Sequence, residues 1–203
     1  MEELNFDVVV VGGGPAGSSA AHMAAKNGCT VALIEKEKEI AETVRTSGVT
    51  WISDINGFGI PKDCYNPIKK FSFCSPKNYV TIADDIAKAA VLDVRKTYRF
   101  LATRAKSSGS ELFTDTNVSE VLKNSAGKCV GVVAKSQGKV MQFNAKVVID
   151  ASGFTSIVAK ELGYVTQWKK FGAGAEFEVK TEKLEYDNWW LMVGQEYSPA
   201  GYA

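Results

Sequence analysis

With 203 residues and a formal net charge of +1, the chain is long enough for one sizeable core, or a core with part of a second domain, and its charge points to neither nucleic acid nor an acidic partner. Hydrophobic residues make up 45% and charged residues 23% of the chain, as in ordinary globular proteins. No apolar run is long enough to span a bilayer, and the short acidic start does not resemble a signal peptide.

The cysteines and the histidine form no disulfide or metal-site pattern. The four cysteines are scattered without a C-x-x-C pair, which favours reduced, mostly buried thiols in a cytoplasmic protein. The lone histidine, His22, falls inside the first expected helix and lacks partners for metal or triad chemistry. We therefore expect no metal centre, and a structural or exposed role for His22.

The first segment is an apolar strand followed by a glycine-rich turn. Phe6–Val11 is a continuous apolar run, typical of a central parallel strand that is buried on both faces. Gly12, Gly14 and Gly17 then satisfy the pattern G-x-G-x-x-G. The first glycine permits a tight turn, the second lets the backbone approach a phosphate, and the third lets the following helix pack closely on the strand.

A helix and a second strand complete this unit. The helix is expected from about Pro15 to Asn27, with proline in its first turn and Gly28 as its stop. The second strand is Thr30–Ile34, and Glu35 at its end stands about 20 residues past the glycines, where a ribose hydroxyl is accepted. The motif alone would also suit an ordinary glycine turn, but the full order predicts a dinucleotide site for NAD or FAD.

Residues 36–106 do not continue with the strand–helix repeat of a plain NAD domain. Lys36–Thr43 is a polar connector, a helix-like segment ends near Gly57–Pro61, and Leu92–Ala102 opens another helix with Asp93 as its N-cap. Between these helices we expect strands at Ile68–Ser75, Tyr79–Ile82 and Ala89–Leu92.

The second half is expected to return to the first sheet. The predicted strands are Glu111–Thr114, which is parallel, then Asn117–Leu122, then Val130–Ala134 and Val140–Phe143, which form an antiparallel meander, and finally Ala145–Asp150, which rejoins the main sheet. A helix at Ile157–Leu162 follows, and Phe171–Val179 and Asn188–Gly194 are predicted to be strands.

This order resembles the FAD-dependent oxidoreductases of the geranylgeranyl reductase family, which are relatives of the aromatic hydroxylases. The resemblance covers essentially the whole chain. It is carried by Gly12–Gly17, Glu35–Lys36, Val44–Gly48, Leu92–Leu101 and Val147–Gly153. It implies an α/β fold: a Rossmann-like FAD/NAD(P)-binding domain with a β-meander and part of an antiparallel substrate-domain sheet.

The resemblance also implies a division into domains. Residues 1–163 would form the FAD-binding domain, with a substrate-facing β insertion at about 62–91, and residues 164–203 would begin the substrate domain. The chain ends within Ser198–Ala203, where the family has a Pro-x-Gly-Tyr-x segment followed by Trp-x-Phe-Pro. We therefore expect a truncated chain that lacks the later Gly-Asp segment of the FAD site and leaves an exposed strand edge.

Two further family segments indicate where the cofactor lies. The family's Arg-Cys-Gly segment, beside the flavin, aligns with Arg45-Thr46-Ser47 followed by Gly48, so the cysteine is absent and no thiol role is carried over. The family's Asp-Arg segment, near the FAD phosphates, appears as Asp93-Val94-Arg95, with Arg95 as the match to the arginine. The alternative for Arg45 and Arg95 is a solvated surface charge.

The resemblance therefore implies FAD as cofactor and a specific set of residues that bind it. Val118 would touch the adenine through its backbone, and Asp150 would lie close to the cofactor, with a turn or cap role expected over a catalytic one. The cofactor-binding set is Gly12, Gly14, Pro15, Ala16, Gly17, Glu35, Lys36, Arg45, Thr46, Ser47, Gly48, Arg95, Val118 and Asp150. No catalytic residue is assigned. Trp51, Phe71, Phe73 and Tyr79 either line an apolar substrate cavity or belong to the core.

Three functions remain open. The first is a flavoprotein reductase that uses NAD(P)H or another reductant to reduce an alkene of an isoprenoid lipid. The second is a flavin monooxygenase or halogenase of the same fold, and the third is a truncated nucleotide-binding remnant without activity. An isoprenoid substrate is compatible with peripheral contact with a membrane, although no amphipathic anchor is evident. The sequence does not indicate an oligomeric state.

Overall fold

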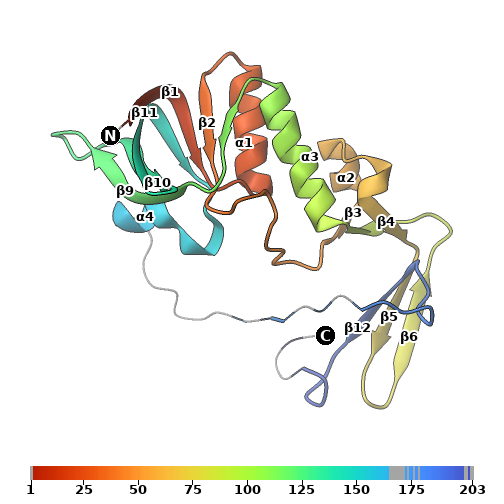
Figure 1. Cartoon of the computed structure of the whole chain (residues 1–203). Coiled ribbons are helices and arrows are strands. Elements are labelled where there is room, and N and C mark those ends of the chain that lie inside the picture. Colours follow the sequence, from red (N-terminus) through yellow and green to blue (C-terminus); the bar gives the residue numbers. More distant parts are fainter. Residues whose placement is uncertain are drawn as a thin grey trace. The chain divides into compact units, whose positions relative to one another are not determined.

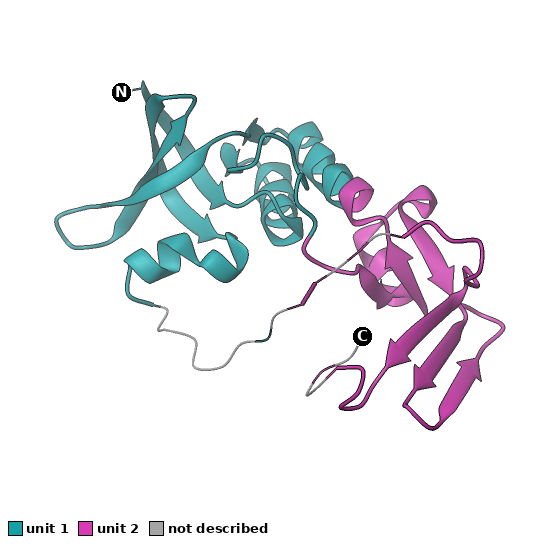
Figure 2. Ribbon diagram, turned by 60° about the horizontal axis from the view of Figure 1, so that its bottom comes forward, with its two compact units in different colours: residues 1–44, 98–173 teal, residues 45–97, 174–203 magenta. Residues whose placement is uncertain are grey.

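The computed structural model describes residues 2–164, 172, 174–175, 177, 179–198 and 201. The chain divides into two compact units (Figure 2): unit 1 contains residues 1–44 and 98–173, and unit 2 contains residues 45–97 and 174–203. The segment 45–97 therefore belongs to the same compact unit as the last part of the chain. A functional boundary at residue 164 stays a prediction.

Unit 1 is built on a six-stranded sheet in the order β8-β2-β1-β11-β10-β9 (Figure 1). Its strands are β1 (Glu2–Val11), β2 (Val31–Ile34), β8 (Glu111–Phe113), β9 (Asn117–Lys123), β10 (Cys129–Ser136) and β11 (Lys139–Asp150). β1 pairs in parallel with both β2 and β11, and β8 is parallel to β2. β9, β10 and the first half of β11 form an antiparallel meander. The predicted central parallel strand and the predicted meander are confirmed.

β11 is one continuous strand, although the sequence predicted two. Asn144 interrupts the apolar pattern at the expected break. In the structure its side chain is held within the sheet, because Asn144 Nδ2 donates to Asn5 Oδ1 at 3.2 Å and Gln142 Nε2 donates to Asn144 Oδ1 at 2.8 Å. β11 can therefore run from the meander directly into the parallel part of the sheet.

Helices cover both faces of the parallel strands in unit 1. These are α1 (Pro15–Lys26), the later part of α3 (Val94–Ser107) and α4 (Ile157–Glu161). One face of β1 and β2 packs against alanines of α1 and α3; this cluster contains Val8, Val10, Val31, Leu33, Ala21, Ala25 and Ala105. The other face packs against side chains of β9, β10, β11 and α4; its residues in β1 and β2 are Val9, Val11, Ala32 and Ile34. The small residues of α1 allow it to lie close to β1 and β2 (Figure 1).

A side-chain contact and the burial of the thiols test the predictions for the histidine and the cysteines. His22 Nδ1 lies 2.8 Å from Ser108 Oγ, which links α1 to the end of α3 and confirms a structural role. Cys64, in unit 2, is buried, whereas Cys29, Cys74 and Cys129 are half-buried. The expectation of mostly buried thiols therefore holds for Cys64 alone.

Unit 2 contains two small sheets. One has the order β3-β7-β4 and is antiparallel; the other has the order β12-β5-β6, with β12 parallel to β5 and β6 antiparallel to it. The elements are β3 (Val49–Trp51), α2 (Ile52–Phe58), the 3-10 helix η1 (Lys62–Cys64), β4 (Tyr65–Ile68), β5 (Lys70–Cys74), β6 (Tyr79–Ala83), β7 (Ala89–Leu92) and β12 (Asn188–Met192). The second sheet is thus mixed, where the sequence predicted an antiparallel one.

The strand predicted for Ile68–Ser75 is divided at Lys69. The backbone N–H groups of Lys69 and Lys70 both donate to the carbonyl oxygen of Asp187, at 2.9 Å each, which ends one pairing and begins the next. The predicted strand at Asn188–Gly194 is confirmed as β12, an edge strand of its sheet. The strand predicted for Phe171–Val179 falls largely outside the described residues.

None of the helices in the described part of the chain combines the length and the hydrophobicity that a membrane span requires.

Candidate functional site

The parallel strands of unit 1 place several predicted residues at one edge of the sheet. Gly12 follows β1, Glu35 follows β2, and Asp150 is the last residue of β11, paired directly with Val11. Because these strands are parallel, their carboxyl ends meet at the same edge, which is where ligands bind in open α/β sheets.

Two glycines of the turn are required by backbone packing. Gly12 has φ +109°, a conformation that glycine tolerates best, and a Cβ there would overlap the carbonyl oxygen of Ala151. A Cβ on Gly17 would overlap the carbonyl oxygen of Gly12. The first glycine thus lets the turn approach the end of β11, and the third lets α1 approach the turn, as the motif predicts.

Gly14 is different, because the fold itself does not require a glycine there. Its φ of −68° is open to any residue, and a Cβ would have no heavy atom within 4 Å. Gly14 is also the N-cap of α1, and no side chain caps that end of the helix. The backbone donors of this helix start are the N–H groups of Gly14, Ala16 and Gly17, since Pro15 has none, and they lie at the positive end of the helix dipole. An anionic group fits this position.

Glu35 is held in place by two backbone N–H groups. Gly13 N donates to Glu35 Oε2 at 2.7 Å, and Glu37 N donates to Glu35 Oε1 at 2.9 Å. A Cβ on Gly13 would lie 2.5 Å from Ile40 Cδ1 and 3.0 Å from the Cβ of Glu35, so a larger residue would require these side chains to shift. Lys36, the next residue, is exposed. The carboxylate keeps lone pairs for further donors, such as ribose hydroxyls.

The chain that follows β8 borders Glu35. Glu35 N donates to Phe113 O at 2.8 Å, and Thr116 N donates to Glu35 O at 2.9 Å. Two residues later, Val118 pairs with Ala134 in the meander, and its side chain is buried in the core. A contact between Val118 and an adenine would therefore use backbone atoms, and it stays a prediction.

Asp150 holds the turn after β11 and the start of α4. Its Oδ1 accepts from Ser152 N at 3.1 Å and Ser152 Oγ at 2.6 Å, and its Oδ2 accepts from Ala159 N at 2.8 Å. Burial alone would raise the pKa of Asp150, but these hydrogen bonds favour the carboxylate and bring its pKa below the usual value. This arrangement supports the turn and cap role over a catalytic one.

The remaining predicted residues belong to unit 2. Arg45, Thr46 and Ser47 are exposed. Gly48 is buried with φ +75°, and a Cβ there would lie 2.8 Å from Val94 Cγ2, so the segment is fixed against the start of α3. The site residues are therefore divided, with the glycine turn, Glu35, Lys36, Val118 and Asp150 in unit 1.

Arg95 lies exposed in the first turn of α3. The N-cap predicted for this helix is confirmed, because Lys96 N donates to Asp93 Oδ1 at 3.0 Å. The extra residue between Asp93 and Arg95 therefore lies within a regular helix start.

One face of the β12-β5-β6 sheet is entirely apolar. Strand alternation and register place these side chains together, and we call them the apolar sheet face: Phe71, Phe73, Val80, Ile82, Trp189 and Leu191. Val80 and Ile82 are 57% and 59% exposed. The opposite face is more polar; there Ser72 Oγ donates to Asn188 Oδ1 at 3.0 Å.

The predicted aromatic residues separate accordingly. Phe71 and Phe73 lie on the apolar sheet face, and Phe71 contacts Trp189 edge-to-face at 5.9 Å between ring centroids. Trp51 and Tyr79 are 58% and 73% exposed, so a core position is wrong for both. Trp51 belongs to β3 in the other sheet, and Tyr79 lies on the opposite face of its own sheet.

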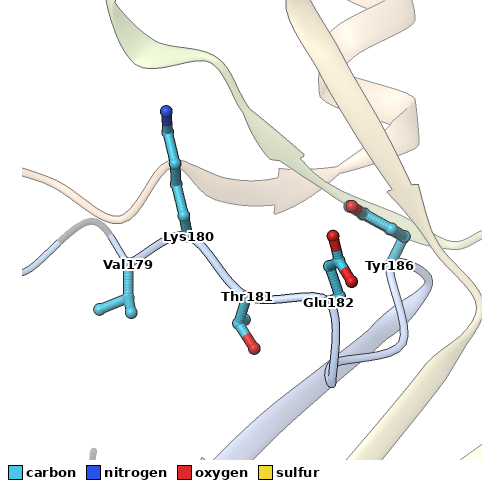
Figure 3. A pocket seen from close by; sticks show the side chains of 5 residues that line it. All are labelled: Val179, Lys180, Thr181, Glu182 and Tyr186. Atoms are coloured by element: carbon cyan, nitrogen blue, oxygen red, sulfur yellow. The ribbon is translucent and has the colours of Figure 1, made fainter.

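A separate hollow of about 500 Å³ lies along residues 179–186 (Figure 3). It is lined by Val179, Lys180, Thr181, Glu182 and Tyr186. Lys180 points away from Val179 and Thr181, so the side chains do not converge on one centre (Figure 3). It contains none of the predicted site residues. Among the described residues, no group of three His, Cys, Asp or Glu side chains could hold a metal ion.

Sequence reasoning missed the contribution of Ser18. This serine follows the last glycine of the motif, is fully buried, and donates from its hydroxyl to Gly13 O at 3.0 Å. A polar residue on the buried side of an alanine-rich helix was the signal that could have identified it.

Comparison with known proteins identifies the family of the chain. A protein-family model described as FAD dependent oxidoreductase matches residues 7–167. The digeranylgeranylglycerophospholipid reductases of Methanocaldococcus jannaschii and Methanococcus vannielii are 34% and 31% identical to 100% and 98% of the chain, and the matches cover 53% and 52% of those proteins. The chain thus spans about half the length of the curated relatives it matches.

Solved structures show the same relationship. A geranylgeranyl bacteriochlorophyll reductase-like protein from Thermoplasma acidophilum superposes with a TM-score of 0.82 and 26% identity, covering 98% of this chain and 53% of that one. A flavin-dependent brominase superposes with a TM-score of 0.65 and 26% identity, over 79% of this chain and 41% of the brominase. The predicted fold class and the choice of FAD over NAD are confirmed, and the chain belongs to the family of FAD-dependent oxidoreductases.

Proposed function

We propose that this chain is the FAD-binding part of a flavin-dependent reductase that saturates alkene bonds of an isoprenoid lipid. The observation that carries the cofactor site is Gly14, a glycine beside open space at an uncapped helix start. The substrate class rests on the relatives, which are named as reductases of a digeranylgeranyl lipid over the full length of this chain.

In this proposal the ADP half of FAD lies at the glycine turn. The pyrophosphate lies beside Gly14, Pro15, Ala16 and Gly17 at the start of α1. It accepts from backbone N–H groups there, although Pro15 has none to donate. Glu35 accepts the ribose hydroxyls with the lone pairs that Gly13 and Glu37 leave free. Lys36 and the Val118 backbone border the adenosine, and Asp150 acts by fixing the turn whose Ala151 carbonyl meets Gly12.

The residues expected beside the flavin belong to unit 2. Arg45, Thr46, Ser47 and Gly48 would lie beside the flavin, and Arg95 would lie near the phosphates. These roles follow from the family resemblance and from the exposure of both arginines. When bound, FAD supplies the hydride-transfer chemistry, and the protein orients it and excludes water. No side chain of the chain is assigned as an acid or base.

The apolar sheet face is the surface we assign to the isoprenoid. Aromatic and aliphatic side chains from three strands form it, and it presents no charged group to a hydrocarbon chain. NAD(P)H or another reductant would reduce the flavin. A cytoplasmic enzyme in peripheral contact with a membrane suits a lipid substrate, and both features belong to the proposal.

Replacing Gly14 tests the cofactor site directly. Gly14→Ala places a methyl group where the phosphate would lie and meets no atom of the fold. We expect FAD affinity, measured by flavin absorbance and fluorescence titration, to fall by at least about tenfold, as for the loss of a charge-assisted hydrogen bond. The melting temperature without FAD should be unchanged.

Gly57→Ala is the matched control, because a Cβ at this position in α2 also has no neighbour within 4 Å. It should bind FAD as the unchanged chain does. Equal FAD binding by Gly14→Ala and the unchanged chain, or no binding by the unchanged chain, would contradict the proposal.

The brominase likeness favours a second candidate, a flavin-dependent monooxygenase or halogenase. It is the weaker proposal, since the brominase covers 79% of this chain and the reductases cover all or nearly all of it. Oxygen-dependent product formation by a full-length relative carrying this sequence would favour the second candidate. FAD binding without turnover in either assay would favour a nucleotide-binding remnant.

A further inference from the structure

Two side chains anchor the middle residue of the glycine turn. Gly13 N donates to Glu35 Oε2 at 2.7 Å, and Gly13 O accepts from Ser18 Oγ at 3.0 Å. The backbone N–H of Ser18 also donates to Gly14 O at 2.9 Å. Glu35 thus reaches the turn from the end of β2, and Ser18 reaches it from inside α1.

The bond from Ser18 fixes the direction of the Gly14 N–H. The carbonyl of Gly13 and the N–H of Gly14 belong to one planar trans peptide, so they point in opposite directions. A hydrogen bond that holds the Gly13 oxygen toward α1 therefore turns the Gly14 hydrogen away from it. In the same way, the bond between Gly13 N and Glu35 fixes the preceding peptide, which contains Gly12 O.

This anchoring is needed because the turn is made of consecutive glycines. Residues without a Cβ occupy several backbone conformations at little cost, so a peptide between two glycines can rotate easily. Gly13 is buried, and without Ser18 its carbonyl oxygen would lack that partner away from water. A buried, unpaired carbonyl is costly enough to drive such a rotation.

We propose that Ser18 is a positioning residue for FAD: its buried hydroxyl holds the Gly13–Gly14 peptide so that the Gly14 N–H faces the pyrophosphate before the cofactor arrives. The inference rests on the proposed function, since it concerns the same site. Ser18 is 0% exposed, so its effect on the cofactor passes through the backbone of the turn. Preorganisation of this kind raises affinity by reducing the ordering that binding requires.

Ser18→Ala tests the inference, with Ser110→Ala as the matched control. Ser110 is 4% exposed, and its hydroxyl also donates to the backbone of α1, to Ala21 O at 3.1 Å, away from the turn. Each variant loses one buried hydrogen bond that involves α1: Ser18 lies in the helix and donates to the turn, whereas Ser110 donates to the helix. Titrations with FAD and with ADP, and amide hydrogen exchange of the chain without ligand, are compared for the two variants.

We expect Ser18→Ala to weaken the binding of FAD and of ADP by the same factor, about tenfold. The hydrogen bond that depends on Ser18 is the one from the Gly14 N–H to the pyrophosphate, which both ligands contain. Amide exchange at Gly13 and at residue 18, whose N–H groups are hydrogen-bonded to Glu35 and to Gly14 O, should quicken in Ser18→Ala and stay unchanged in Ser110→Ala. Equal ligand affinity in the two variants, with equal exchange at the turn, would overturn the inference. A chain that binds neither FAD nor ADP before substitution would instead overturn the proposed function.

Discussion

Unit 1 and unit 2 differ in where their apolar side chains lie. In unit 1 the largest side chains of the core, including Phe143, Leu33 and Ile34, are 1% exposed or less. Both faces of its parallel strands are covered by helices or by the meander. Unit 2 buries Ile55 and Ile68, which are 1% and 2% exposed, but leaves large apolar side chains such as Ile82 and Ile86 59% and 69% exposed.

This difference separates two uses of apolar residues. Unit 1 uses them to close its own core, which fixes the glycine turn and Glu35 before a ligand binds. Unit 2 presents them on the apolar sheet face, where they are available to a hydrocarbon ligand or to another layer of polypeptide. Cofactor binding should therefore depend on the stability of unit 1, whereas substitutions on the apolar sheet face should leave the fold intact.

The largest expected effect is that of Phe143→Ala in unit 1. The Phe143 ring is fully buried, and its centroid lies 5.0 Å from that of Phe113 and 6.3 Å from that of Phe6. Removing it leaves a cavity between these rings, and the free energy of unfolding should fall by about 3–5 kcal/mol. Denaturant unfolding measures the loss. Ile82→Thr, on the apolar sheet face, is the control and should change stability by about 0.5 kcal/mol or less. Equal losses would remove the distinction between the units.

A smaller loss is expected for Gly17→Ala. The added methyl group would overlap the carbonyl oxygen of Gly12, and two backbone segments would have to separate. Overpacking of this kind costs about 1–3 kcal/mol. Thermal unfolding without ligand should reveal it, while Gly14→Ala should melt like the unchanged chain. If the two variants melted alike, the division between a glycine needed by the fold and one needed by the ligand would be wrong.

The smallest effect is a pH dependence at Asp7, which lies in β1 just before its pairing with β2 begins. Lys146 and then the N–H and hydroxyl of Thr30 lower the pKa of Asp7 from 3.8 to about 2. Because the folded pKa is depressed, the Asp7 carboxylate stabilises the fold above about pH 4, and this contribution is lost as the pH falls toward 2. Urea unfolding between neutral pH and pH 2 should therefore show a shallower acid loss in Asp7→Asn.

Lys146→Gln provides the complementary test of this carboxylate. Lys146 Nζ lies 2.7 Å from Asp7 Oδ1. Without the ammonium group the pKa of Asp7 should rise toward its usual value, so the loss of stability as the pH falls from about 4 toward 2 should become smaller, as in Asp7→Asn. An unchanged pH profile in both variants would show that Asp7 does not contribute to the acid sensitivity of unit 1.

Much of the glycine turn and its neighbours in unit 1 could be predicted, because the sequence patterns that indicate them are local. The apolar run of β1, the glycines, the start of α1 and Glu35 lie within one short stretch, and neighbouring residues decide turns, helix starts and strand ends. The N-cap at Asp93 could be predicted for the same reason. The two-strand prediction for β11 failed at Asn144, because this residue is paired with Asn5 of β1, far away in sequence, and so continues the strand.

Other parts of the site depend on contacts between distant segments. Glu161, in α4, accepts from Val121 N on the edge strand β9 with both carboxylate oxygens, at 3.0 and 3.1 Å. Asp150 similarly joins the end of β11 to α4. No sequence pattern predicts either of these hydrogen bonds. The predicted roles of Arg45 and Arg95 come from the family resemblance, since nothing near them in sequence specifies a flavin.

The sequence by itself determined the order of strand, glycine turn, helix and acid, and with it the class of cofactor, because these features depend on backbone conformations set by adjacent residues. Only the tertiary structure decided what each glycine is for. Gly12 and Gly17 face backbone carbonyls of Ala151 and of Gly12, whereas Gly14 faces open space. It also decided that Trp51 and Tyr79 are exposed, because burial depends on which distant segments cover a side chain.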